Sequence, residues 1–126
     1  MSDIAEGLFY HEAHDWLSVD GDTGTTGLTD YAQAELGDVV FLELPEVGTE
    51  VTLGESYGTV EAVKTVADLI SPVTGKVVEI NEQLQEDASL VNTDPYGEGW
   101  TIRIRLADAC EVDELMSADT YRESLE

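Results

Sequence analysis

Short β-prone segments, separated by glycine, aspartate and proline, run through most of the chain, and this pattern restricts the fold more than any other feature. Such segments, rich in β-branched and aromatic residues, are typical of strands. Their spacing of roughly 8–12 residues predicts a small sandwich or barrel. We expect strands over residues 16–19, 25–28, 39–44, 51–53, 57–60, 66–70, 76–80 and 100–106.

Helical signals are confined to two places. Thr29 is a suitable N-cap for a helix over residues 30–36, and Gly37 stands where a glycine would end that helix. Near the C-terminus, residues 112–116 and 118–125 are expected to be helical, with Ser117 as a cap between them. No linker, low-complexity stretch or tandem repeat divides the sequence, so we expect a single domain over residues 1–126.

The segment between Gly58 and Pro72 permits two interpretations. Four apolar residues recur there at helical spacing, namely Val60, Val63, Ala67 and Ile70. However, five β-branched residues lie between positions 59 and 66, and such side chains lose rotamer freedom in a helix. We therefore favour two strands joined by a tight turn that carries residues 62–64.

The chain is very acidic, and this excludes several classes of partner. Five lysine and arginine residues against 28 aspartate and glutamate residues give a net charge of −23. A surface this negative repels nucleic acids and anionic lipid headgroups. No apolar run approaches the ~20 residues of a membrane-spanning helix, and the acidic N-terminus does not resemble a secretory signal. With Cys110 as the single cysteine, we expect a cytoplasmic protein without nucleic-acid or membrane partners.

The same charge points to a cytosol rich in salt. Self-repulsion of this size destabilises a compact domain in dilute buffer. At salt near 1 M the Debye length falls to ~3 Å, and most of the repulsion is screened. The chain has only two lysines, Lys64 and Lys76. We therefore infer a halophilic source, with an ordinary acidic protein as the alternative.

Lys64 is the most informative single position, because lysine is nearly eliminated from the rest of the chain. Retention of a lysine at the tip of a turn, in a chain with so few lysines, can indicate that its amine has a chemical role. The alternative is a surface ion pair, for example with Glu61, although such a pair contributes only ~0–1 kcal/mol. Lys76, which follows Gly75 and opens a strand, is interpreted as structural, as a lysine that protects a sheet edge.

The remaining candidate residues do not predict a catalytic or metal site. The run Asp20-Gly21-Asp22 fails as an EF-hand loop, because the places of the required glycine and glutamate hold other residues, and a hairpin turn fits better. His11 and His14 have only the distant Cys110 as a further soft ligand, so packing and surface hydrogen bonding are favoured over zinc. The acidic neighbours of Cys110 disfavour ionisation of its thiol to the thiolate. Since the thiolate is the nucleophilic form, a catalytic pair of cysteine and histidine is also disfavoured.

Several short segments, each weak alone, form a specific series when they are taken in order. They are Tyr10, His14-Asp15-Trp16, Gly27-Leu28-Thr29-Asp30-Tyr31-Ala32-Gln33, Leu36-Gly37-Asp38-Val39-Val40-Phe41, Leu44-Pro45-Glu46-Val47-Gly48, Gly58-Thr59-Val60-Glu61-Ala62-Val63-Lys64, Ser71-Pro72-Val73-Thr74-Gly75-Lys76-Val77-Val78, Asn81-Glu82 and Asn92-Thr93-Asp94-Pro95-Tyr96-Gly97-Glu98-Gly99-Trp100. In this order and spacing the chain resembles the H proteins of glycine cleavage systems over nearly its whole length.

The resemblance implies a mainly β fold of the lipoyl type. This fold is a barrel-sandwich hybrid of two small antiparallel sheets, with short helices and a C-terminal helix. The resemblance also implies a lipoyl-binding core over residues 24–106 and a lipoyl group attached covalently to Lys64 as an amide. It implies no metal site and no catalytic residue, because such a protein is a carrier and not an enzyme.

The same resemblance implies the partners. The P protein, a glycine dehydrogenase that uses pyridoxal phosphate, decarboxylates glycine and loads an aminomethyl group onto the lipoyl arm. The folate-dependent T protein, an aminomethyltransferase, removes this group, and the flavin-dependent L protein, a dihydrolipoyl dehydrogenase, reoxidises the arm. A lipoylating enzyme attaches the arm. A shuttle that visits several enzymes is expected to be a monomer.

The sequence departs from the family pattern at three positions. Ala62 replaces the usual serine, Thr65 the usual alanine and Asp15 the usual glutamate. Ala62 and Thr65 lie close to Lys64 and bear on how quickly a lipoylating enzyme recognises it, but they leave the amine in place. The loaded arm is expected to fold back against the body, with residues 14–16 and the surroundings of Asp68 as candidates for its cleft.

Other carriers fit the sequence less well. Biotin carriers usually place methionine on both sides of the lysine, whereas Val63 and Thr65 flank Lys64. Lipoyl domains of 2-oxoacid dehydrogenases are shorter and have no counterpart of residues 92–100 or of the C-terminal helices. A lipoyl relay protein, which donates its lipoyl group to other proteins, uses the same lysine and stays an open alternative.

Overall fold

The structure is a computed structural model in which residues 4–125 are described. Within this range the chain forms nine strands, four α-helices and one 3-10 helix. The strands are β1 (Phe9–Tyr10), β2 (Asp15–Asp20), β3 (Thr23–Leu28), β4 (Val39–Glu43), β5 (Glu50–Val51), β6 (Ser56–Ala62), β7 (Val66–Ile70), β8 (Gly75–Ile80) and β9 (Ile102–Leu106). The helices are α1 (Asp30–Leu36), α2 (Gln83–Glu86), α3 (Leu90–Thr93), η1 (Ala109–Glu114) and α4 (Ala118–Ser124).

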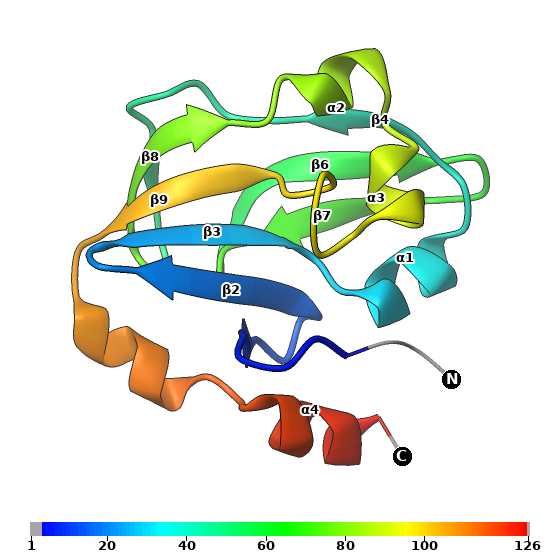
Figure 1. The fold of residues 1–126 in the computed structure, drawn as a ribbon. Coiled ribbons are helices and arrows are strands. Elements are labelled where there is room, and N and C mark those ends of the chain that lie inside the picture. The colour runs from blue at the N-terminus through cyan, green and yellow to red at the C-terminus, as the bar shows by residue number, and fades with distance from the viewer. Residues whose placement is uncertain (1–3, 126) are drawn as a thin grey trace.

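The strands form two antiparallel sheets that face each other (Figure 1). The larger sheet has the order β1-β2-β3-β9-β8-β5, and the smaller has the order β4-β6-β7. Buried side chains from both sheets belong to one hydrophobic cluster. The predicted mainly β fold, with two antiparallel sheets and short helices, is therefore confirmed.

The core between the sheets fixes the smaller sheet in place. On β4 and β6, Leu42 lies opposite Val60, and both side chains are fully buried. On the larger sheet, Val77 lies opposite Ile104, and these too are fully buried. Burial of each such side chain contributes ~1.5–3 kcal/mol. The strands that lead to and from Lys64 are thus held by the core.

The segment that permits two interpretations is a hairpin. β6 pairs with β7, and the pairing continues to Glu61 opposite Val66. The predicted pair of strands with a tight turn is therefore confirmed, and the helical interpretation is excluded. The turn protrudes at the periphery of the molecule, at the right-hand end of Figure 1.

Helix α1 begins and ends where the sequence predicts. The Thr29 side chain accepts a hydrogen bond from the backbone N–H of Ala32 at 3.2 Å, which caps the helix. Gly37 adopts a φ of 80° and donates its N–H to the carbonyl of Gln33. This left-handed residue turns the chain directly from α1 toward β4.

Several short elements differ from the prediction. The sequence pattern does not predict β1, α2 or α3; the two helices have four residues each and no side-chain hydrogen bond at their N-caps. In place of the helix expected over residues 112–116, the chain forms the 3-10 helix η1, which begins and ends earlier in the sequence because the Asp108 side chain caps its start. The strand expected over residues 51–53 is only β5, because Leu53 donates its N–H to Thr74 Oγ1 and leaves the ladder.

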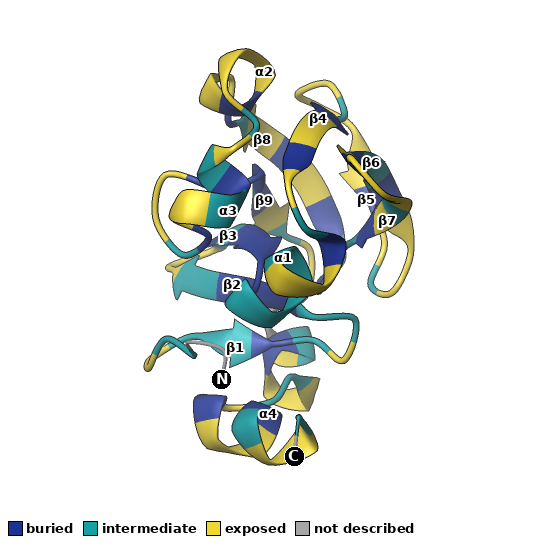
Figure 2. Ribbon diagram, turned by 90° about the vertical axis from the view of Figure 1, so that its right-hand side faces the viewer, coloured by how far each residue is buried: buried dark blue, intermediate teal, exposed yellow. Residues whose placement is uncertain are grey.

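The C-terminal segment packs on β1, at the edge of the larger sheet (Figures 1 and 2). Tyr10 and Tyr121 are fully buried there, and their rings stack with centroids 4.6 Å apart. Ser117 caps α4 by accepting a hydrogen bond from the N–H of Thr120. The predicted C-terminal helix is confirmed. None of the helices within residues 4–125 has the length and apolar character that crossing a bilayer requires.

Gly58 provides a test of the contact between β4 and β6. A Cβ atom at this position would overlap the backbone carbonyl of Glu43 on β4, so Gly58→Ala must push two paired backbones apart. We predict that this substitution lowers the free energy of unfolding in urea by about 2 kcal/mol or more. Thr52→Ala, at an exposed position outside the strands, is the control and should unfold with the parent. Equal midpoints for all three proteins would contradict this packing.

Candidate functional site

Lys64 lies in the turn between β6 and β7. The backbone N–H of Ala62 donates to the carbonyl of Thr65 at 2.8 Å, which closes the turn. Val63, Lys64 and Thr65 are all exposed. The primary amine of Lys64 is therefore carried at the tip of a hairpin whose strands are paired almost up to the lysine.

The turn is also braced from the side by the segment that joins α1 to β4. The backbone N–H of Val63 donates to the carbonyl of Asp38 at 3.0 Å. The Lys64 stem runs beside Gly37, where a Cβ atom would lie 3.3 Å from Lys64 Cε. Gly37 is thus favoured by its positive φ, and its missing side chain leaves the exposed lysine stem unobstructed.

Asn92, in α3, fixes this bracing segment. Its Nδ2 donates to the carbonyl of Gly37 at 2.8 Å and to Gln33 Oε1 at 2.9 Å, and its Oδ1 accepts from the N–H of Val39 at 2.8 Å. The bonds to Gly37 and Val39 hold the backbone on both sides of Asp38. The local sequence around Asn92 does not predict this positioning role. The only sequence signal for it is its place in the last segment of the family series.

The ion pair expected as the alternative role of Lys64 is not formed within residues 4–125. The four ion pairs in this range are all made by arginines, namely Arg103, Arg105 and Arg122. An exposed primary amine on a fixed backbone can act as an attachment point. We therefore take the Lys64 turn, braced by Asp38 and Asn92, as the candidate functional site.

The two histidines have packing and hydrogen-bonding partners, as the sequence interpretation favours. His14 Nδ1 lies 2.9 Å from the hydroxyl of Tyr121, and its ring lies against Tyr31 with centroids 4.6 Å apart. His11 Nδ1 accepts from the N–H of Ala13 at 3.0 Å. Burial lowers the pKa of both imidazoles below the ordinary value. Within the described part of the chain, no group of three histidine, cysteine or acidic residues is placed to hold a metal ion.

Cys110 lies exposed in η1. The nearby negative charge of Asp108 is the largest cause that raises the pKa of its thiol. The thiol is therefore less reactive than an ordinary cysteine at neutral pH.

The Asp20-Gly21-Asp22 run forms the hairpin turn between β2 and β3, with Asp20 opposite Thr23. The role predicted for Lys76 is wrong in one respect. Lys76 does not protect a sheet edge, because β5 pairs with this end of β8 and places Glu50 opposite Lys76. On its other side Lys76 lies opposite Arg105 of β9.

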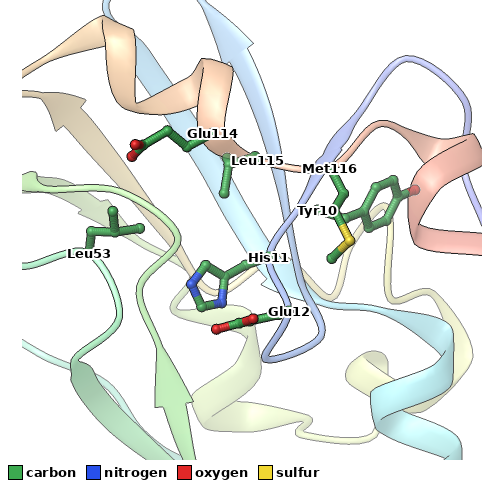
Figure 3. A pocket seen from close by; sticks show the side chains of 7 residues that line it. All are labelled: Tyr10, His11, Glu12, Leu53, Glu114, Leu115 and Met116. Atoms are coloured by element: carbon green, nitrogen blue, oxygen red, sulfur yellow. The ribbon is translucent and has the colours of Figure 1, made fainter. Parts of the chain in front are cut away.

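A hollow of about 280 Å³ lies between β1 and the end of η1 (Figure 3). His11, Glu12 and Glu114 are its polar residues, and the rest of the lining is Tyr10, Leu53, Leu115 and Met116. None of the residues that form or brace the Lys64 turn lines this hollow. The hollow is therefore separate from the candidate site.

Asp15 is a buried carboxyl on β2. Both of its side-chain oxygens are shielded from solvent, and neither has a hydrogen-bond partner among the described residues. This desolvation raises the pKa of Asp15 well above the ordinary value. Of the two stretches expected to form an arm-binding cleft, one thus holds this buried acid, whereas Asp68 of the other is exposed on β7.

A family model described as glycine cleavage H-protein matches residues 8–126. The glycine cleavage system H protein of Carboxydothermus hydrogenoformans is 50% identical, with 100% of this chain and 97% of the relative covered. A protein of Haloarcula marismortui named "Probable glycine cleavage system H protein" is 47% identical, with 98% of each chain covered. The crystal structure of a glycine cleavage system H protein from Mycobacterium marinum is similar with a TM-score of 0.89 at 39% identity, and the match covers 97% of this chain and 98% of that one.

The burial of Asp15 predicts a specific pH dependence of stability. The folded-state pKa lies above that of the unfolded chain, so the carboxyl is neutral in both states below about pH 4. As the pH rises further, the unfolded chain releases this proton first, and folding loses stability until the pH passes the folded-state pKa. Asp15→Asn has no such proton to lose. We predict that the variant is more stable than the parent by an amount that grows with pH.

Urea unfolding of both proteins at a series of pH values checks this prediction. All other titrating groups are shared, so their effects cancel in the difference between the two free energies of unfolding. A difference that stays constant from about pH 3 to about pH 8 would show that Asp15 ionises equally well in both states.

Proposed function

The chain belongs to the family of glycine cleavage H proteins, and we propose that Lys64 is the residue that bears its lipoyl group. The protein is the lipoyl carrier of the glycine cleavage system, a non-catalytic subunit with a covalently bound lipoate. The observation that carries the assignment to Lys64 is the exposed amine at the tip of a hairpin with a fixed backbone.

The surroundings of Lys64 fit an attached acyl group. The neighbours Val63 and Thr65 are exposed, so an enzyme can approach the amine from solvent. The absence of a side chain at Gly37 leaves room for the lysine stem. Lys76, the other lysine, is also exposed, but it lies within a paired sheet between Glu50 and Arg105 and not at the tip of a turn.

Attachment is an acyl transfer to the Lys64 nitrogen. The nitrogen displaces the leaving group of an activated lipoyl donor, which is an acyl adenylate or an acyl thioester. A C–N bond forms, the bond from the acyl carbon to oxygen or sulfur breaks, and the ammonium of the lysine releases two protons in all, one before attack and one after. No electrons are transferred. The lysine loses its charge, so the net charge changes from −23 to −24.

When it is attached, the lipoyl group supplies a disulfide that takes up the aminomethyl fragment of glycine with two electrons. The contribution of this chain is positional. The hydrogen bonds of Asp38 and Asn92 hold the anchor point still, and the hairpin keeps it in solvent. Proteins of this family work with the P, T and L proteins. We propose that the Lys64 turn is presented to all three, and to a lipoylating enzyme.

We also propose one domain over residues 1–126, with a lipoyl-binding core over residues 24–106. The packing supports this division. The main core cluster is formed largely by residues of β3 to β9, whereas Tyr10 and Trp16 pack with residues of α4 in a second cluster. We propose that the protein acts as a cytoplasmic monomer, because a carrier must leave one enzyme to reach the next.

The charge of −23, with two lysines in the chain, supports a proposed adaptation to high salt. The relative from Haloarcula marismortui, a halophilic archaeon, is consistent with this source. At molar salt the repulsion between the 28 acidic side chains is screened.

The two lysines allow a matched test of the attachment site. Lys64→Arg keeps the charge but removes the amine that can be acylated, and Lys76→Arg is its control. We predict that the parent and Lys76→Arg gain the mass of one lipoyl group when they are produced with a lipoylating enzyme, whereas Lys64→Arg gains none. Intact-protein mass spectrometry measures this directly. A lipoyl mass on Lys64→Arg, or its loss from Lys76→Arg, would refute the assignment.

The proposed salt adaptation predicts a steep rise of the melting temperature with KCl concentration, because screening removes charge repulsion from the folded state. Sucrose at equal osmolality is the control, since it favours burial of apolar surface without screening charge. The melting temperature should rise much more in KCl than in sucrose. A flat response to KCl would mean that the acidic composition is not an adaptation to salt.

A further inference from the structure

Exposed apolar side chains gather at the end of the smaller sheet that carries Lys64. Within residues 4–125, six large hydrophobic residues are exposed, and four of them are Val40, Phe41, Val63 and Val66. Val63, which precedes Lys64, is 75% exposed, Val66 is 61% exposed and Phe41 is 45% exposed. We call these four residues the apolar patch. In a surface dominated by carboxylates, a group of exposed apolar side chains at one end of a sheet is a mark of an interaction site.

The pairing of the strands places the patch residues on both sides of the exposed carboxylate of Glu61. Phe41 of β4 lies opposite Glu61 of β6, which in turn lies opposite Val66 of β7, so the three share one row on the outer face of the sheet. A bulge between Val39 and Phe41 adds a residue to β4 and leaves Val40 exposed beside the row. Figure 2 shows the exposed residues of β4 and of the β6–β7 hairpin.

Besides Glu61 within it, further carboxylates surround this patch. Glu43 and Asp68 lie at the two ends of the next outward-facing row, with Thr59 between them, and both are exposed. Asp38 is also exposed and lies beside Val63, because its backbone carbonyl accepts a hydrogen bond from the N–H of Val63. A complementary partner has apolar side chains for the patch, a basic side chain opposite Glu61, and further lysine and arginine side chains around them.

We propose that the apolar patch is the docking surface for the enzyme that acylates Lys64, which presents an apolar surface with a basic rim. This inference rests on the proposed attachment at Lys64. The patch begins at the residue next to the lysine, and an enzyme that forms a bond to the Lys64 nitrogen has to bring its active site to that atom. It therefore covers Val63 and Val66. Enzymes that act at the far end of a flexible arm do not need to contact the patch.

The salt adaptation gives the apolar residues a distinct part in this docking. At molar salt, attraction between the carboxylate rim and a basic partner is screened beyond ~3 Å. Burial of apolar surface is not screened in this way. The patch therefore supplies the affinity in concentrated salt, and the rim discriminates against partners without basic residues.

The kinetics of acylation test this proposal. The concentration of the lipoate-free protein is varied at a fixed concentration of a purified lipoate ligase, with lipoate, ATP and Mg²⁺ in excess. The rate of acylation is measured by intact-protein mass spectrometry. The test variant is Phe41→Thr/Val66→Thr, because threonine keeps the β-branched shape that suits a strand. The control is Val47→Thr/Val78→Thr, which changes two exposed valines outside the patch; Val47 is as exposed as Val66, at 61%. Val63→Ser, in the turn, tests the patch without a change in either strand.

We expect the KM for the test variant to rise roughly tenfold with little change in kcat, as for loss of contacts made equally in the ground and transition states. Val63→Ser should raise KM in the same direction, and the control should match the parent. The test variant should still reach full acylation at high protein concentration, unlike Lys64→Arg.

Three outcomes would overturn the proposal. The first is an unchanged KM for the patch variants, and the second is an equal rise in the control. The third is a parent dimer that the patch substitutions dissociate, which would assign the patch to a second copy of the chain. A parent that is never acylated at Lys64 would instead refute the proposed function, so the two failures are distinguishable.

Discussion

The backbone contact between the Lys64 turn and the segment after α1 is the constraint on which the proposed attachment at Lys64 depends. Val63 donates its N–H to Asp38, and Asn92 bonds the residues on both sides of Asp38. Each such hydrogen bond contributes only ~0.5–1.5 kcal/mol of net stability. Together they fix the position of a turn that the core reaches only at Ala62, whereas residues 63–65 are exposed. The proposed anchor of the lipoyl arm, Lys64, is thereby exposed and still held in place.

The other features of the protein serve this display. The two sheets hold the hairpin through their shared core, and α1 and α3 contribute Gly37 and Asn92 to the brace. The carrier role requires no acid, base or nucleophile of its own, which agrees with histidines whose pKa burial lowers and a cysteine whose pKa its acidic neighbour raises. In the proposed docking, the acidic surface and the apolar patch select the enzyme that acylates Lys64, and salt weakens only the electrostatic part of this selection.

Local signals in the sequence predicted the elements whose limits depend on interactions between residues close together in the chain. The Thr29 cap and Gly37 gave the limits of α1, and β-branched residues gave the hairpin at Lys64. The brace was not predictable in this way, because Asn92 and Val39 are 53 positions apart and their contact depends on how the chain returns. The same reason applies to the burial of Asp15 and to β5, whose pairing with Lys76 gives that lysine two neighbours across the sheet.

Backbone order parameters from ¹⁵N relaxation test the fixed display of Lys64 most directly. If the Asp38–Val63 contact and the Asn92 bonds hold the turn, the amides of Val63, Lys64 and Thr65 will have values like those of β6 and β7, about 0.85. Values below about 0.6 at these amides, with the flanking strands ordered, would show a flexible turn. The lysine would then be presented by a mobile loop, and the central claim would be wrong.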